Sequence, residues 1–180
     1  MNELTIIAAV TGGILTVFNV LPALAPERAQ SWFKAFPRHV LCGRVLAAAA
    51  LAWAGWLLYH TPLGALERYR PLVYLLTPTA YVLVIVFVDD LLAPRALGGL
   101  MLLAPEPILA AARFHPSPFR VVMLVLAYVL VVGGMALVLS PYLFRKAAER
   151  LFGTRLGCRL WGGLGLGLGL LIVLLGLAVY

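Results

Sequence analysis

Charged residues are scarce in this chain. Asp, Glu, Lys and Arg make up 12% of its 180 residues, against about 25% in a typical soluble domain. Hydrophobic residues make up 63%, and the mean hydropathy is +1.01. So few charges cannot cover a water-facing surface, which excludes an ordinary soluble domain. The composition predicts one integral membrane domain over residues 1–180.

Residues that carry common catalytic chemistry are also few. The two cysteines, Cys42 and Cys158, form neither a CxxC motif nor a Cys/His cluster, so no metal site is predicted. The three serines lie between apolar runs and have no GxSxG motif around them. Neither a Walker A motif nor a GxGxxG fingerprint is present. The sequence therefore predicts a protein that is not an enzyme and has no cofactor.

Long apolar runs are abundant instead. A helix needs about 20 mostly apolar residues to cross the hydrocarbon core of a bilayer. Six runs of about that length predict six transmembrane helices, arranged as three hairpins: Leu4–Ala23, Val40–Tyr59, Leu72–Val88, Pro94–Ala112, Val121–Leu139 and Leu160–Ala178. The predicted fold class is thus all-α and polytopic.

Two links between these runs mix basic and aromatic residues. They cover Ala25–Arg38 and Ser140–Arg155, and each has a proline near its start. This composition predicts two amphipathic helices that lie on the membrane surface. The longer segments 4–60 and 121–178 share the order helix, basic amphipathic link, helix. This is either a weak internal repeat or a shared membrane-interface composition.

The basic residues are distributed unevenly among the links. With six spans, ten of the 14 Lys and Arg residues fall on one side and four on the other. The positive-inside rule then places links one, three and five in the cytoplasm and both termini outside. The net charge of +7 is explained by topology and by contact with anionic lipid headgroups, so nucleic acid is not expected as a partner.

The last apolar run contains an alternating Gly and Leu segment. A lone strand in lipid would leave backbone groups without partners, so this run is predicted to be helical. Four glycines then form one stripe: Gly162, Gly165, Gly169 and Gly176. Small residues at this spacing allow close helix packing. Gly163 and Gly167 form a second stripe, which predicts two close neighbours. Gly12-Gly13 and Gly133-Gly134 are expected to supply complementary notches.

Glu106 is the sharpest candidate for function. It lies between Pro105 and Pro107 in the run 94–112, about 18 Å along the helix from Pro94. An ionisable group within a membrane span is by default a hypothesis of function. The alternatives are a neutral carboxyl, a pair with Arg113 or His115, or a re-entrant turn.

A second group of charges follows the third run. Asp89 and Asp90 are adjacent, so they point in different directions on a helix, and Arg95 follows them. Together they form either an interface salt bridge or a cation or proton site. Asn19, near the end of the first run, is expected to form an interhelical hydrogen bond.

The last hairpin, Leu124–Leu177, resembles small two-helix bacterial inner-membrane proteins of unknown function. The shared features are a Gly-containing first helix that ends at Pro141, a basic amphipathic link, and a Gly/Leu-rich second helix. The resemblance covers under a third of the chain. It implies a bacterial inner-membrane setting and brings no catalytic residues with it.

Three functions fit these features. The leading expectation is a non-enzymatic packing or accessory subunit, in a homo-oligomer or a larger membrane complex. The alternative is a small oligomeric transporter or channel that uses Glu106, with Asp89 or Asp90 as a further candidate. A membrane enzyme acting on lipid ranks last, because no catalytic constellation supports it.

Overall fold

Helices form all the regular structure in the described part of this computed structural model, which covers residues 3–62, 64, 67, 70–87, 91–113 and 115–180. The elements are α1 (Glu3–Leu24), α2 (Pro26–Ala35), the 3-10 turn η1 (Phe36–Arg38), α3 (Val40–His60), α4 (Leu72–Phe87), α5 (Leu92–Leu103), α6 (Pro105–Arg113), α7 (Arg120–Leu139), α8 (Tyr142–Phe152) and α9 (Arg155–Ala178). The predicted all-α class is confirmed.

Five helical segments of the described chain are long and apolar enough to cross a membrane. They are α1, α3, the joined pair α5–α6 over Leu92–Arg113, α7 and α9. This is the architecture of a multi-pass helical membrane protein. Helix α4 has 16 residues, or about 24 Å, which is shorter than a hydrocarbon core of about 30 Å. The six-span topology therefore stays a prediction.

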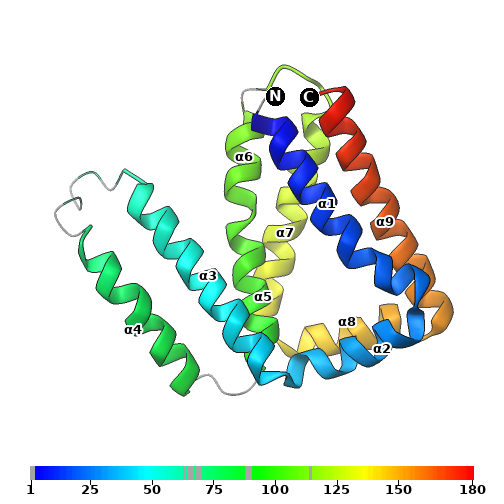
Figure 1. The fold of residues 1–180 in the computed structure, drawn as a ribbon, viewed down its shortest axis with the longest axis horizontal. Coiled ribbons are helices and arrows are strands. Elements are labelled where there is room, and N and C mark those ends of the chain that lie inside the picture. The colour runs from blue at the N-terminus through cyan, green and yellow to red at the C-terminus, as the bar shows by residue number, and fades with distance from the viewer. Residues whose placement is uncertain (1–2, 63, 65–66, 68–69, 88–90, 114) are drawn as a thin grey trace.

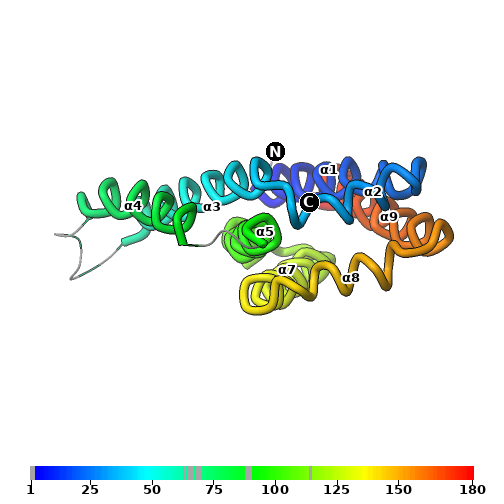
Figure 2. Tube along the Cα trace, turned by 90° about the horizontal axis from the view of Figure 1, so that it is seen from below, coloured from blue at the N-terminus to red at the C-terminus, as the bar shows by residue number. Residues whose placement is uncertain are grey.

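The long helices form three groups (Figure 1). Helix α1 packs on α9, α5–α6 packs on α7, and α4 packs on α3. The first two groups come together at the end that holds both chain termini and diverge toward the other end. There α2 and α8 lie across the bundle, and Figure 2 shows them from below. Helices thus occupy both links that the sequence predicts to be amphipathic.

Among the described residues, helices α1 and α9 make the most extensive helix–helix contact. The four glycines of the predicted stripe all face α1. A Cβ atom added at Gly162 would lie 2.6 Å from Ala23 N, and one at Gly169 would lie 2.9 Å from Gly12 O. At Gly165 the added atom would collide with the side chain of Asn19. Only glycine allows the two backbones to approach this closely.

The other glycines of the sequence analysis differ in their surroundings. Added Cβ atoms at Gly163 and Gly167 meet nothing within 4 Å, so no described residue packs closely against this second stripe of α9. Gly134 does not face α9 either. A Cβ atom there would lie 2.8 Å from Gly98 O of α5. The notch in α7 therefore serves the α5–α7 crossing, because α5 and not α9 lies beside it.

The apolar core joins the first two groups near the termini. Its fully buried side chains come from α1, α6, α7 and α9: Leu4, Ala8, Ile108, Ala112, Met123, Ala127 and Ile172. A smaller cluster of Ala47, Leu92 and Ala96 joins α3 to α5, with Tyr81 of α4 packed against it. The α3–α4 hairpin is thus attached to the rest of the protein mainly through α5.

The C-terminus is tied to the α6–α7 loop. The hydroxyl of Tyr180 donates a 2.6 Å hydrogen bond to Phe119 O. Its ring makes an edge contact with His115, at 5.4 Å between centroids. Arg120 closes the same loop by donating to His115 O at 2.9 Å. These bonds fix the end of α9 beside the start of α7.

A pH-dependent contribution to stability is expected from this contact. Partial burial raises the pKa of Tyr180 above its ordinary value of 10.0. A raised folded-state pKa adds stability below pH about 10, and this is lost as the pH rises through the folded-state value. Tyr180→Phe should lower the free energy of unfolding by about 0.5–1 kcal/mol at neutral pH. The difference from wild type should shrink in strongly alkaline solution, as measured by denaturant titration at several pH values. A difference that stays constant with pH would contradict this.

Candidate functional site

Glu106 lies in the first turn of α6, directly after Pro105. Its side chain is exposed, although the segment Leu92–Arg113 is apolar enough to span a membrane. It forms no hydrogen bond or ion pair with any residue of the described part, so a pair with Arg113 or His115 is not formed. The His115 ring instead accepts a hydrogen bond from Ser117 N at 3.2 Å. Glu106 sits seven residues before Arg113, or about 10 Å inside that end of the helix.

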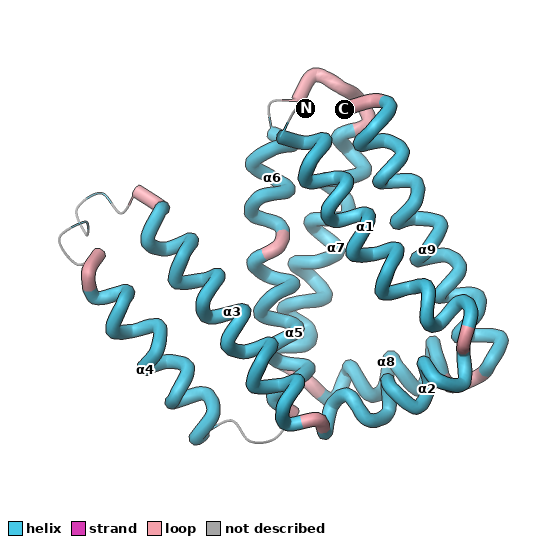
Figure 3. The backbone as a smooth tube through the Cα atoms, viewed as in Figure 1, coloured by secondary structure: helices cyan, strands magenta, loops and turns pink. Residues whose placement is uncertain are grey.

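The face of α6 that carries Glu106 points away from the core. Pro105, Ile108 and Ala112 fill the buried face. Ala104, between α5 and α6, has helical backbone angles (φ −59°, ψ −33°), so the helical phase continues across the break seen in Figure 3. Glu106 follows Gly99 by seven residues, which is close to two full turns. It therefore continues the face on which a Cβ atom added at Gly99 would lie 3.8 Å from the Cβ atom of Ala50 in α3.

Of the other predicted charges, the structure describes only Arg95, and it does not join Glu106. Asp89 and Asp90 lie outside the described residues. Arg95 is exposed in the first turn of α5. It is eleven residues from Glu106, about 16 Å along the α5–α6 axis. Arg95 and Glu106 therefore belong to opposite parts of the span and cannot form one site.

A second candidate, not anticipated from the sequence, lies between the two lateral helices. Phe33 of α2 stacks on Phe152 of α8 at 4.4 Å between ring centroids, and Phe36 contacts Phe144 at 5.2 Å. The residue that comes first in the chain, Phe33, meets the later residue of α8, and Phe36 of η1 meets the earlier one, so α2 and α8 run antiparallel. The sequence predicts that the apolar faces of both links contact the membrane. In the structure, part of each face instead packs α2 against α8.

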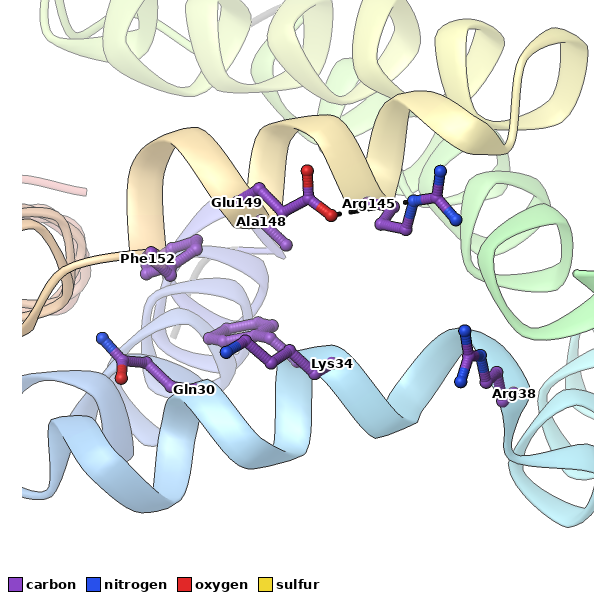
Figure 4. A pocket seen from close by; sticks show the side chains of 9 residues that line it. Gln30, Lys34, Arg38, Arg145, Ala148, Glu149 and Phe152 are labelled. Carbon is purple, nitrogen blue, oxygen red and sulfur yellow. Dashed lines mark ion pairs between the residues drawn. The ribbon is translucent and has the colours of Figure 1, made fainter.

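A groove of about 400 Å³ opens between these helices (Figure 4). We call it the α2–α8 groove. Its lining residues are Gln30, Phe33, Lys34, Arg38, Arg145, Ala148, Glu149, Phe152 and Gly153. Figure 4 shows Arg38 and Arg145 on opposite walls at one end of the groove and Gln30 near the other. Each helix thus contributes at least one basic side chain.

The polar groups of the groove are incompletely paired. Glu149 is its only acidic residue, and it faces Arg145 at a long 3.7 Å between Oε1 and Nε. Both side chains are more than 60% exposed, so this ion pair contributes little. The Nε2 atom of Gln30 is buried and has no hydrogen-bond partner in the described structure. The groove therefore offers donors in excess of acceptors.

Metal chemistry finds no support in the described part of the chain. No group of three or more His, Cys, Asp or Glu side chains there could hold a metal ion. His39 accepts a bond from Cys42 N at the start of α3, and His60 Nδ1 lies 2.8 Å from Trp56 O in the last turn. Both histidines are thus engaged at helix ends.

Comparisons with known proteins add no functional assignment. No protein-family model, curated protein or solved structure matches this chain. The resemblance of residues 124–177 to small two-helix membrane proteins stays a prediction.

Proposed function

We propose that this protein is a non-enzymatic accessory subunit of the bacterial inner membrane, and that it binds a partner helix at the face of α6 that carries Glu106. The proposed topology has six spans, including the short α4, with both termini outside the cytoplasm. The ten-to-four division of basic residues supports this orientation.

The observation that carries this proposal is the exposure of Glu106 within an apolar span. Ionisable groups within membranes almost always face a protein interior or a water-filled cavity, because lipid cannot solvate a charge. In the described part of the chain, the exposed Glu106 side chain has no hydrogen-bond or ion-pair partner. A partner helix with a hydrogen-bond donor or a cation at the depth of Glu106 would supply a protein environment for its carboxyl group. We infer a partner helix because this is the chemistry that the carboxyl group needs.

Transport is the second candidate function. The break at Ala104 lies two residues before Glu106, and interrupted helices beside an ionisable group are typical of transporter sites. In this alternative, water rather than a partner helix meets the carboxylate. The two functions thus differ in what surrounds the same side chain.

Site-specific photo-crosslinking in native membranes tests the proposed function. A photoreactive residue at Ala110, exposed one turn beyond Glu106, should form one adduct with a partner protein. Glu106→Leu should reduce the adduct at least about fivefold, since a polar contact between membrane helices contributes about 1 kcal/mol. Glu106→Gln, which still forms hydrogen bonds, should retain most of it. A photoreactive residue at the exposed Val125 of α7 is the control and should give no such adduct.

The result also separates the alternatives. An adduct of twice the mass of the chain identifies the partner as a second copy. If no adduct forms, the accessory function is wrong. Cysteine at position 106, in a variant without Cys42 and Cys158, then tests transport. Labelling from one side by a membrane-impermeant reagent, blocked by a solute, would favour a transporter.

A further inference from the structure

The α2–α8 groove lies at the end of the bundle where four long helices begin or end. Helices α1 and α7 end at Leu24 and Leu139, and α3 and α9 begin at Val40 and Arg155. Helices that span a bilayer end near its headgroups. Because α2 and α8 connect these ends directly (Figure 1), the groove is at headgroup level whichever side of the membrane it faces.

This end of the protein is strongly basic. Residues 24–44 and 140–159 together contain nine Lys and Arg residues and only two Glu residues. One of these, Glu27, pairs with Arg155 at 2.8 Å outside the groove. An anionic ligand is therefore attracted to this surface before it meets any specific contact.

The groove adds specific contacts to this general attraction. The guanidinium groups of Arg38 and Arg145 approach one end from opposite walls (Figure 4), and each carries five N–H donors. Lys34 adds an ammonium group on the α2 side. The buried Nε2 of Gln30 lacks an acceptor in the described structure. The two guanidinium groups at one end of the groove fit the oxygens of a phosphate group, and the Gln30 amide near the other end is placed to donate to an oxygen of the glycerol and ester region of the same ligand.

The same groove has an apolar component. Phe33 and Phe152 stack within its wall, beside Ala148. A soluble phosphate ion would gain nothing from these rings, whereas the glycerol and ester region of a lipid would bury apolar surface against them. A volume of about 400 Å³ lies within the usual range of small-molecule sites.

We propose that the α2–α8 groove is a binding site for the phosphate group of an anionic phospholipid, held between Arg38 and Arg145. The ligand class is a phosphodiester headgroup with a net negative charge, as in phosphatidylglycerol. This site is independent of the partner proposed at Glu106, which lies within the α6 span.

The test uses the full-length protein, delipidated in a neutral detergent, and native mass spectrometry. Dioctanoyl phosphatidylglycerol is titrated against dioctanoyl phosphatidylcholine and inorganic phosphate. The anionic lipid should bind at least about tenfold more tightly than either. The variant Arg38→Gln/Arg145→Gln should weaken its binding about 30-fold, at about 1 kcal/mol for each basic residue.

A matched control keeps the net charge of this variant but leaves the groove intact. Arg28→Gln/Arg150→Gln removes one arginine from α2 and one from α8, and neither of these arginines lines the groove. Lipid binding should change less than about threefold in this control. Gln30→Met should weaken binding about fivefold without any change in charge. Arg38→Lys/Arg145→Lys should retain binding better than the Gln variant, and it replaces that variant if the latter does not fold.

Three outcomes would overturn the proposal. Equal losses in the groove and control variants would mean diffuse surface attraction without a site. Inorganic phosphate that binds as tightly as the lipid would make soluble phosphate the ligand. Equal binding of phosphatidylcholine and phosphatidylglycerol would remove the need for an anionic headgroup.

Discussion

Replacing Gly169 with leucine is expected to separate α1 from α9 and to lower the free energy of unfolding by about 3 kcal/mol. A Cβ atom at this position would lie 2.8 Å from Thr16 N and 2.9 Å from Gly12 O. These are backbone atoms within a helix, so they cannot rotate away as a side chain can. The helices must move apart, and contacts along their whole length weaken with them.

The neighbouring stripe of the same helix supplies the control. Gly167 lies two residues away, and an added Cβ atom there meets nothing within 4 Å. Gly167→Leu should leave stability unchanged or raise it by up to about 1 kcal/mol, because leucine favours the helix more than glycine does. Unfolding in mixed detergent micelles, followed by circular dichroism, measures both variants. Equal stability of Gly169→Leu and Gly167→Leu would show that α1 and α9 are not closely packed at Gly169.

Replacing Gly134 with leucine is expected to open the α5–α7 crossing, also at a cost of about 3 kcal/mol. Gly98 and Gly134 face one another, and a Cβ atom on either would lie 2.8–2.9 Å from the carbonyl oxygen of the other. This crossing connects the α3–α4 hairpin to the rest of the protein through α5. Limited proteolysis should therefore cut the α3–α4 hairpin faster in this variant.

Gly133 allows a matched comparison at the same crossing. An added Cβ atom there meets only the Cε atom of Met101, at 2.8 Å, and a flexible methionine can move aside. Gly133→Ala should thus change stability by less than about 0.5 kcal/mol. The double variant Gly98→Ala/Gly134→Ala should be less destabilised than the sum of the single variants, since one separation of the helices relieves both contacts. Additive losses would argue against a shared contact.

The helices can be predicted from the sequence because each one depends mainly on the residues within its own segment. Apolar runs of about 20 residues determine α1, α3, α7 and α9 wherever their neighbours lie. The stripe of four glycines on α9 likewise depends only on helical periodicity. Periodicity cannot identify the helix that packs on this stripe, because α1 is far from α9 in the sequence. For the same reason, the expectation that Gly134 supplies a notch for α9 is wrong: periodicity identifies a face of a helix and not the helix that packs on it.

For the polar residues too, the sequence predicts local structure but not the contacts between distant segments. The sequence predicts that Asn19 bonds to another helix, yet its Nδ2 donates to Leu15 O of α1 at 2.8 Å while its side chain covers Gly165. Within lipid, the second lone pair of a carbonyl oxygen in its own helix is an adequate partner. The sequence does not predict the α2–α8 groove, because its walls come from links more than 100 residues apart. The aromatic and basic residues shared by both links were the available signal.

The pairing of α1 with α9 has a consequence for biosynthesis. Gly12 leaves the ribosome 157 residues before Gly169, the glycine it contacts. At a synthesis rate of about 5–20 residues per second, α1 waits roughly 8–30 seconds for its partner. During that interval its glycine face is open to lipid or to any other nascent helix. Insertion of the first helix and closure of the bundle are therefore separate events, and the last helix completes the fold.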